Sequence, residues 1–270
     1  MAKLSKTFTI TSFSNDKVKY VHKLREKRNR DREGKFLIEG FRELTRALQS
    51  KKITFQSLFV APDCFLGKNE ERLVEKLNTT TFTLPRKLFE KISYRDRPDG
   101  LLAVCQTPDF HLKEDTQLSG DFFLIIEGVE KPGNLGTILR TAEGAGVSAI
   151  FVTDPRIDLF NPNVIRSSTG TLFTSTVYKS TTEQVLGFLQ NQGVVIFAVT
   201  PKAEQYYFQQ SYQERFALMF GSEQYGLSEY ARNTITTGVS LPMLGEADSL
   251  NLAMSCGILI YEVVRQRMQK

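Results

Sequence analysis

Three segments of the sequence combine glycine with small polar residues, and each follows a short apolar run. They span residues 126–142, 219–228 and 241–251. Since short continuous apolar runs are typical of strands buried on both faces, each segment is predicted to leave the carboxyl end of a strand. Open α/β sheets bind their ligands at that edge. The sequence therefore indicates three turns that could share one binding site.

The first segment runs from a predicted strand through a glycine-rich loop into a predicted helix. We expect Asn134 to cap this helix, whose free N–H groups could hold an anion. No Gly-Lys-Ser/Thr follows, so the loop is not a Walker loop, and its glycine spacing does not match the dinucleotide fingerprint. Arg140 lies about two turns into the helix. This segment alone leaves open whether Arg140 is a surface residue or a ligand contact.

The other two segments also have local structural explanations. In the second, Glu223 lies between two glycines that could form a tight turn or let the backbone approach a ligand closely. In the third, Asp248 or Ser249 is a suitable helix cap. Asn251 is predicted in the first turn of the most apolar helix, where a buried amide needs partners. Each turn taken singly is therefore weak evidence for a site.

Taken together and in this order, the three segments resemble the motifs of the SpoU/TrmH branch of the SPOUT RNA methyltransferases. The resemblance covers about residues 121–267, with Ser222 and Gln224 as departures from the usual pattern. Residues 15–105 more loosely resemble the ribosomal-protein-like substrate-binding domain of some members. The matching motif residues are Asn134, Gly136, Arg140, Thr141 and Ala142, then Phe220, Gly221, Glu223, Gly226 and Leu227, then Pro242, Met243, Gly245, Ser249, Leu250 and Asn251.

The resemblance implies a mostly parallel α/β sheet with flanking helices and a deep trefoil knot. It also implies S-adenosylmethionine as cofactor and methyl transfer to a ribose 2′-hydroxyl of RNA. Since a guanidinium stays protonated, Arg140 is interpreted as a clamp for a developing alkoxide or a phosphate, with proton removal left open. The implied catalytic residues are Arg140, Asn134, Glu223, Ser249 and Asn251, and the implied cofactor contacts are Thr200, Gly221, Leu241, Met243 and Leu250.

The pattern along the chain predicts two α/β domains. We expect a small α/β sandwich over residues 1–106, a polar linker over 107–120 containing an exposed His111, and the catalytic domain over 121–270. Predicted strands are 35–39, 55–60, 81–84 and 101–104, then 122–126, 149–153, 174–177, 194–199, 217–220 and 239–241. Predicted helices include 70–77, 86–92, 135–145, 182–190 and a nearly all-apolar one over 250–266.

Positive charge is concentrated at the start of the chain. Residues 1–60 hold 15 Lys and Arg against 6 Asp and Glu, whereas the other residues hold 20 against 24. Charge alone leaves a solvated helix face equally acceptable, but a dense basic face also attracts nucleic-acid phosphates. Together with the resemblance, this segment is predicted to bind structured RNA. The candidate contacts are Lys17, Lys19, Lys23, Arg25, Lys27, Arg28, Arg30 and Arg32.

Composition excludes several other classes. Three widely spaced cysteines and two histidines argue against a disulfide framework or a zinc site, so no metal is expected. No apolar run approaches the roughly 20 residues of a membrane span, and the first six residues lack an apolar signal core. We therefore expect a cytoplasmic protein. The apolar last helix is predicted to be buried inside the domain or in a homodimer like those of the relatives.

Three alternatives differ in substrate or activity. Ribosomal RNA is favoured as the substrate, because the amino-terminal domain resembles a ribosomal protein. A tRNA 2′-O-methyltransferase, or a non-catalytic RNA-binding or ribosome-assembly protein on the same fold, remains open. A ring-nitrogen methyltransferase is less favoured, since the spacing from Asn134 to Arg140 is typical of the ribose-modifying branch. The sequence does not indicate which nucleotide is methylated.

Overall fold

The computed structural model describes residues 6–269, which form two compact units. The first unit contains the residues up to Asp109 together with Asp158–Thr174. The second unit contains Phe110–Ile157 and the chain from Ser175 onward. The chain therefore passes between the units three times. The remaining residues, 1–5 and 270, lie outside the described part, as does most of the segment predicted to lack a signal core.

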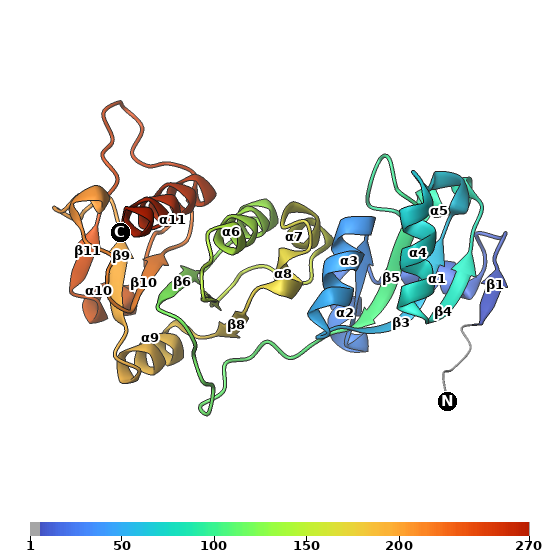
Figure 1. Cartoon of the computed structure of the whole chain (residues 1–270), viewed down its shortest axis with the longest axis horizontal. Coiled ribbons are helices and arrows are strands. Elements are labelled where there is room, and N and C mark those ends of the chain that lie inside the picture. The colour runs from blue at the N-terminus through green and yellow to red at the C-terminus, as the bar shows by residue number, and fades with distance from the viewer. Residues whose placement is uncertain (1–5, 270) are drawn as a thin grey trace. The chain divides into compact units, whose positions relative to one another are not determined.

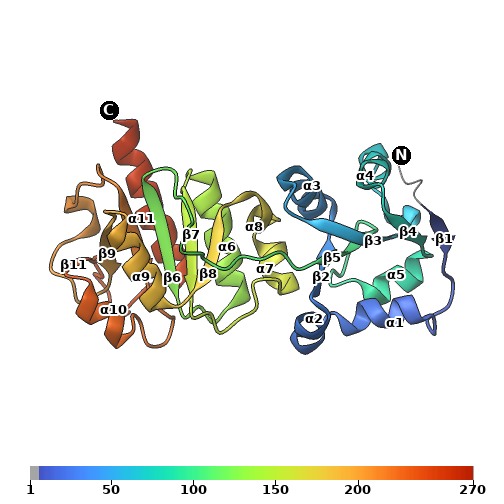
Figure 2. The ribbon, with the colours of Figure 1, turned by 90° about the horizontal axis from the view of Figure 1, so that it is seen from below.

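The first unit is built on a mixed five-stranded sheet, which is shown in Figures 1 and 2. The strand order is β1-β4-β3-β5-β2, and only β5 runs antiparallel to its neighbours. Its strands are β1 Thr7–Thr9, β2 Lys35–Glu39, β3 Thr54–Val60, β4 Thr80–Thr83 and β5 Leu101–Gln106. Its helices are α1 Asp16–Lys23, α2 Lys27–Glu33, α3 Phe41–Ser50, the 3₁₀ turn η1 Pro62–Cys64, α4 Lys68–Leu77, α5 Arg86–Ile92, α7 Pro162–Ser167 and α8 Thr171–Thr174.

Local signals explain several of these elements. The side chain of Asn15 accepts a hydrogen bond from the backbone N–H of Lys17 and so caps α1, as its position before an apolar-periodic segment suggests. Val18 and Val21 then lie on the buried face of α1. They join an apolar cluster that includes Phe59 and Phe89. The small α/β sandwich expected for this part of the chain is therefore present, with β1 as an additional edge strand.

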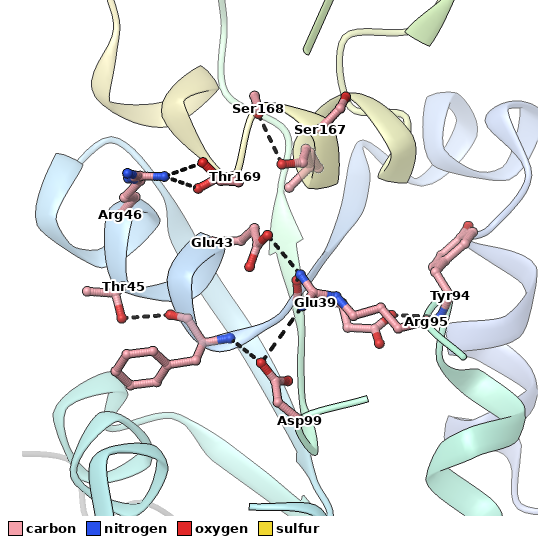
Figure 3. Close-up of polar contacts among 12 residues, drawn as sticks. Glu39, Glu43, Thr45, Arg46, Tyr94, Arg95, Asp99, Ser167, Ser168 and Thr169 are labelled. Carbon is pink, nitrogen blue, oxygen red and sulfur yellow. Dashed lines mark hydrogen bonds and ion pairs between the residues drawn. The ribbon is translucent and has the colours of Figure 1, made fainter. Parts of the chain in front are cut away.

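The helices α7 and α8 belong by their contacts to the first unit, although they were predicted within the domain 121–270. Phe36 of β2 packs against Phe160 and Phe173, with ring centroids 4.7 and 5.9 Å apart. The Arg46 guanidinium donates to both the carbonyl and the hydroxyl of Thr169 (Figure 3). Gly170 has a φ of +83°, and a Cβ there would lie 2.8 Å from the Cα of Glu43 in α3. Such short helices have too few residues for a periodic signal, so the sequence did not reveal them.

The second unit has a six-stranded sheet in which all neighbouring strands are parallel, in the order β11-β9-β10-β6-β7-β8. This confirms the expected fold class. Its strands are β6 Phe122–Glu127, β7 Ala149–Thr153, β8 Val177–Ser180, β9 Val195–Val199, β10 Phe216–Phe220 and β11 Thr237–Val239. Its helices are α6 Pro132–Gly144, α9 Thr182–Asn191, the 3₁₀ turn η2 Tyr207–Gln209, α10 Glu229–Thr234 and α11 Leu252–Met268.

Helices cover both faces of this sheet, as Figures 1 and 2 show. The helices α9 and α10 pack on the face that presents Phe123 and Met219, forming one apolar cluster. The helices α6 and α11 pack together on the other face, and the Arg267 guanidinium of α11 lies over the rings of Phe122 and Phe216. Burial on both faces explains why these strands are nearly continuous apolar runs.

The segments 174–177 and 107–120 also differ from the sequence expectations. The segment 174–177, predicted as a strand, instead ends α8 and begins β8 at Val177. Its predicted β pattern was short and mixed with Thr and Ser, which also favour turns. The polar segment 107–120 is more ordered than a simple linker. His111 forms a parallel bridge with Lys179, and the backbone N–H of Leu112 donates to the Lys179 carbonyl at 3.1 Å.

Candidate functional site at the carboxyl edge of the parallel sheet

Four neighbouring strands bring the predicted site turns to one edge of the sheet. Leu241 follows β11, Thr200 follows β9, Gly221 follows β10, and the loop to Asn134 follows β6. The chain builds outward from β6 through β7 to β8, and then continues on the other side of β6 with β10 and β9. The strand order therefore reverses between β6 and β10. This is the position at which open α/β sheets bind ligands at the carboxyl ends of their strands.

Hydrogen bonds join one residue from each of the three motif segments. The Asn134 Nδ2 donates to Glu223 Oε1 at 2.9 Å, and the Asn251 Nδ2 donates to Asn134 Oδ1 at 3.2 Å. The Glu223 carboxylate also accepts from the backbone N–H groups of Glu130 and Lys131, at 3.1 and 3.3 Å. Segments separated by 89 and 117 residues are thus held together by polar side chains.

The chemistry of the two ends fixes the orientation of both amides in this network. An ionised carboxylate only accepts hydrogen bonds, so Asn134 must direct its NH₂ group toward Glu223. At the other end, Asn251 Oδ1 accepts from the backbone N–H groups of Ala253 and Met254, at 3.0 and 3.4 Å. This leaves the NH₂ group of Asn251 for the Asn134 oxygen. The network is therefore consistent in its donors and acceptors from one end to the other.

The structure corrects the predicted helix caps. Asn134 does not cap α6, because that helix begins at Pro132, follows Lys131 as its N-cap and has no side-chain cap. Pro at the first helical position gives the helix an earlier start than its apolar pattern shows. The cap of α11 is Asn251, and neither Asp248 nor Ser249 holds this position. Asn251 thus has a structural role at the helix end as well as its bond to Asn134.

The second segment forms a closed loop that needs glycine at Gly221. Ser222 and Gly226 exchange two backbone hydrogen bonds, at 2.9 and 3.1 Å, and Gly226 has a φ of +67°. A Cβ built at Gly221 would overlap the backbone of Gly226 and Leu227. The loop also packs against the first segment, because a Cβ at Gly128 would lie 3.3 Å from the Ser222 Cβ. Glycine here serves close backbone approach, as the sequence suggested.

The third segment presents backbone groups that could hold a cofactor. Leu241 and Met243 are half-buried, whereas the residues that follow are exposed as a long loop before α11 (Figure 1). Within residues 6–269, the backbone of 241–250 makes no hydrogen bond of its own. Free backbone N–H and C=O groups beside apolar side chains suit a nucleoside, whose base has a polar edge and apolar faces. The residues at this edge therefore fit the adenosine part of S-adenosylmethionine.

Arg140 and Ser249 are not part of the network. Both side chains are exposed, and neither makes a hydrogen bond or an ion pair with another described residue. Thr200 is half-buried, and its N–H donates to the carbonyl of Val239 at 3.0 Å, which holds it at the carboxyl edge. The structure thus brings Asn134, Glu223 and Asn251 into contact, and leaves Arg140 with a free guanidinium.

A buried polar group behind the site escaped the sequence analysis. Glu127, at the end of β6, accepts from the Thr182 hydroxyl and from the Ser228 backbone N–H, both at 2.8 Å. The Thr182 hydroxyl also lies 3.0 Å from that of Thr153. Glu127 therefore fastens the carboxyl end of β6 to the starts of α9 and α10. The sequence signal that could have identified Glu127 is a single carboxylate at the end of an otherwise apolar strand.

The structure corrects one predicted RNA contact. Arg30 is only 4% exposed, pairs with Asp158 at 2.7 Å and donates to two backbone carbonyls, so it has a structural role. Arg25 is half-buried, donates to the carbonyl of Ser93 and lies over the Tyr94 ring. The other candidates remain at the surface. Three of them pair with neighbouring acids, namely Lys19, Lys27 and Arg32. The other three have no ion-pair partner within the described chain, namely Lys17, Lys23 and Arg28.

Other features of the described residues lie apart from this edge. A cavity of about 420 Å³ lies at the opposite edge, against the amino-terminal ends of β9, β10 and β11, and includes Val195 and Phe216 in its lining. Among residues 6–269, no cluster of three or more His, Cys, Asp or Glu side chains is arranged to bind a metal. Nor does any helix in this range have the length and apolar character to cross a bilayer.

Two family models match this chain. The SpoU rRNA Methylase family matches residues 121–261, and the MRM3-like substrate binding domain matches residues 15–103. The chain is 30% identical over 256 residues to the 23S rRNA (guanosine(2553)-2′-O)-methyltransferase RlmP of Bacillus subtilis, covering 94% of this chain and 98% of the relative.

Solved structures give the same result. An RNA 2′-O ribose methyltransferase has a TM-score of 0.84 and 35% identity, over 97% of this chain and all of that chain. An AdoMet-bound rRNA methyltransferase from Sinorhizobium meliloti has a TM-score of 0.86 and 27% identity, over 96% of this chain and 98% of that one.

The class defined by this fold and site is that of the RNA methyltransferases, and the chain belongs to the SpoU rRNA methylase family. It is an S-adenosylmethionine-dependent enzyme that methylates the ribose 2′-hydroxyl of RNA, which confirms the sequence prediction at this level. An amino-terminal substrate-binding domain is confirmed as well.

Proposed function

We propose that this protein methylates a ribose 2′-hydroxyl in 23S ribosomal RNA. The observation that carries the proposal is the network of Asn134, Glu223 and Asn251, which ties the three family motifs together where the strand order reverses. The choice of 23S rRNA is supported by the relatives, since RlmP of Bacillus subtilis and RlmB of Vibrio cholerae are both named for it. The proposal places the enzyme in the cytoplasm, with the ribosomal RNA.

The chain's own residues would hold the cofactor through backbone groups at Gly221, Leu241 and Leu250, with Thr200 and Met243 beside them in the pocket. When bound, S-adenosylmethionine supplies an activated methyl group. The half-buried side chains of Leu241 and Met243 would exclude water from the adenosine. The trefoil knot expected for this part of the fold remains a prediction.

Arg140 is the residue proposed to act on the ribose hydroxyl. Its guanidinium is exposed and unpaired among residues 6–269, so it is available for a developing alkoxide or an adjacent phosphate. Asn134, Glu223 and Asn251 are positioning residues, because their polar groups are engaged with one another. Ser249 is proposed to orient the substrate or the cofactor through its hydroxyl, which has no partner within the described chain.

The amino-terminal unit is proposed to hold the RNA by its phosphates. Lys17, Lys23 and Arg28 support this role because each is exposed and has no ion-pair partner among the described residues. Exposed cations of this kind release counterions when they meet RNA phosphates, so binding is expected to weaken with salt.

A homodimer through the catalytic domain is proposed from one face of α11 and from Leu250, which lies two residues before the helix begins. Leu250, Met254 and Tyr261 are 40%, 61% and 53% exposed, which is unusual for large apolar side chains at neighbouring positions. Light scattering coupled to gel filtration measures the mass directly. A monomer at micromolar concentration would contradict this proposal.

The test uses in vitro transcribed 23S rRNA, labelled S-adenosylmethionine and three variants of one helix. Arg140→Ala should lower kcat by about 10²–10³-fold, as does loss of one donor to an oxyanion, while S-adenosylmethionine binding stays intact. The kcat of Arg140→Lys should fall between those of the wild type and Arg140→Ala, because lysine keeps the positive charge and loses the two-pronged donor geometry of the guanidinium. Glu143→Ala, an exposed change on the same helix, is the control.

The outcomes separate the proposal from its alternatives. Full activity of Arg140→Ala would exclude the proposed role of Arg140. Methylation of tRNA in place of 23S rRNA would identify a tRNA enzyme, and cofactor binding without methylation of any RNA would indicate an RNA-binding protein. Mass spectrometry of the nuclease-digested product places the methyl group on the ribose or on a ring nitrogen.

A further inference from the structure

The side chain of Tyr225 makes none of the described hydrogen bonds that close its own loop. The Ser222–Gly226 backbone bonds close that loop, and the Tyr225 backbone N–H donates to the Ser222 hydroxyl at 3.1 Å, which any residue except proline could do. The Tyr225 ring itself is 63% exposed, and its hydroxyl has no hydrogen-bond partner among residues 6–269. A large aromatic ring left in solvent beside a catalytic site suggests a ligand contact.

A fixed cation holds one side of this ring. The Arg156 guanidinium carbon lies 5.3 Å from the Tyr225 ring centroid. Arg156 is itself held at both ends, since its Nη1 donates to Glu130 Oε1 at 2.9 Å and its backbone N–H donates to the Val129 carbonyl at 3.1 Å. This cation–π contact restrains the ring on one side, which reduces the side-chain entropy lost when the other face makes a contact.

The ring and its cation lie next to the site network. Glu223, which holds Asn134, lies two residues before Tyr225 in the same closed loop. Glu130, which holds Arg156, donates its backbone N–H to that same Glu223 carboxylate at 3.1 Å. Lys131, Arg140 and Arg156 are all exposed on this part of the chain. An aromatic face among exposed cations matches an unpaired nucleotide, which has a base to stack and phosphates to neutralise.

We propose that Tyr225 stacks on an unpaired base of the RNA substrate beside the methylated nucleotide, and that Arg156 is the positioning residue that orients its ring. This inference rests on the proposed function, because it assigns a substrate contact to the same site. It adds a recognition residue outside the three-motif network and gives the loop between Gly221 and Gly226 a second role beyond holding Glu223.

Steady-state kinetics with 23S rRNA transcript test the contact. Tyr225→Ala should raise KM for RNA by roughly 5- to 150-fold, the range expected for loss of one stacked base, with kcat and S-adenosylmethionine affinity unchanged. Tyr225→Phe should keep the wild-type KM for RNA, since phenylalanine keeps the aromatic ring. Arg156→Gln should raise KM less than Tyr225→Ala does. Tyr230→Ala removes another tyrosine of the same unit, which is 43% exposed, and should leave KM unchanged.

Because the chain contains no tryptophan, Tyr225→Trp gives a single fluorescent reporter at this position. Its emission should be quenched by the 23S transcript, as stacking on a base requires. An unchanged KM in Tyr225→Ala, an equal rise in Tyr230→Ala, or no quenching at saturating RNA would overturn the inference. If the wild-type enzyme methylates the transcript in these cases, the proposed function stands; if wild type methylates no 23S rRNA, it is the proposed function that fails.

Discussion

The two units differ in where their most extensive polar contacts lie. In the first unit, charged residues are buried within the fold: Arg30 pairs with Asp158, and Arg95 pairs with Glu43 at 2.8 Å (Figure 3). In the second unit, an apolar core covers both faces of the sheet, and the polar network of Glu223 and its partners lies at the carboxyl edge. Buried charge joins segments of the fold in the first unit, as Glu127 does in the second, whereas the polar network at the carboxyl edge of the second unit builds a site.

The largest expected effect is on the buried ion pair of the first unit. Arg30→Ala should destabilise this unit by about 3–5 kcal/mol, because it leaves the Asp158 carboxylate buried without its partner. Urea unfolding, with hydrogen exchange of peptides from each unit, measures the effect and where it occurs.

The control for Arg30→Ala is Lys27→Ala on the same helix, which breaks a pair with Asp31 whose side chains are 61% and 56% exposed. That change should cost less than about 1 kcal/mol. Equal losses in the two variants would show that burial of the Arg30 pair is unimportant and would remove the contrast between the units.

A smaller effect is expected from steric overlap in the second unit. Gly221→Ala places a Cβ on the backbone of Gly226 and Leu227 and should cost about 1–3 kcal/mol, with weaker S-adenosylmethionine binding as the loop shifts. Calorimetry and cofactor titration measure the two consequences. The matched change Gly133→Ala meets no atom within 4 Å in α6 and should not lower stability. Normal cofactor affinity of Gly221→Ala would contradict the role given to this loop.

The smallest effect concerns pH and has opposite signs in the two units. Burial raises the pKa of Glu39 and Glu43 above the ordinary value of 4.5. Their contribution to stability is therefore fully present below pH 4.5 and is lost as the pH rises through the folded-state pKa. In the second unit, the hydrogen bond from Arg265 lowers the pKa of Glu262, so its contribution is present above pH 4.5 and is lost as the pH falls.

Hydrogen exchange between pH 4 and pH 7 can measure these slopes after correction for the intrinsic exchange rate. Glu43→Gln should flatten the dependence in peptides of the first unit and leave that of the second unit unchanged. The same pH dependence of stability in both units, or an unchanged slope in Glu43→Gln, would show that burial of these carboxyls does not control the pH dependence.

Local patterns predicted much of the secondary structure. The helix Arg86–Ile92 and the strand Ala149–Thr153 have the predicted bounds, because periodicity and flanking turn residues are local properties. The edge strand Thr7–Thr9 and the short helices α7 and α8 were missed, since three to six residues show no period. The three motif turns were also identified from residue types and spacing alone.

The sequence by itself determined most of the strands, the glycine turns that follow them and the basic charge near the start of the chain. Only the tertiary structure decided which side chains meet there. It buried Arg30 against Asp158, joined Asn251 to Asn134, and set Arg156 against Tyr225. The physical reason is that backbone pattern depends on near neighbours, whereas these contacts depend on strand order, which brings together residues that are distant along the chain.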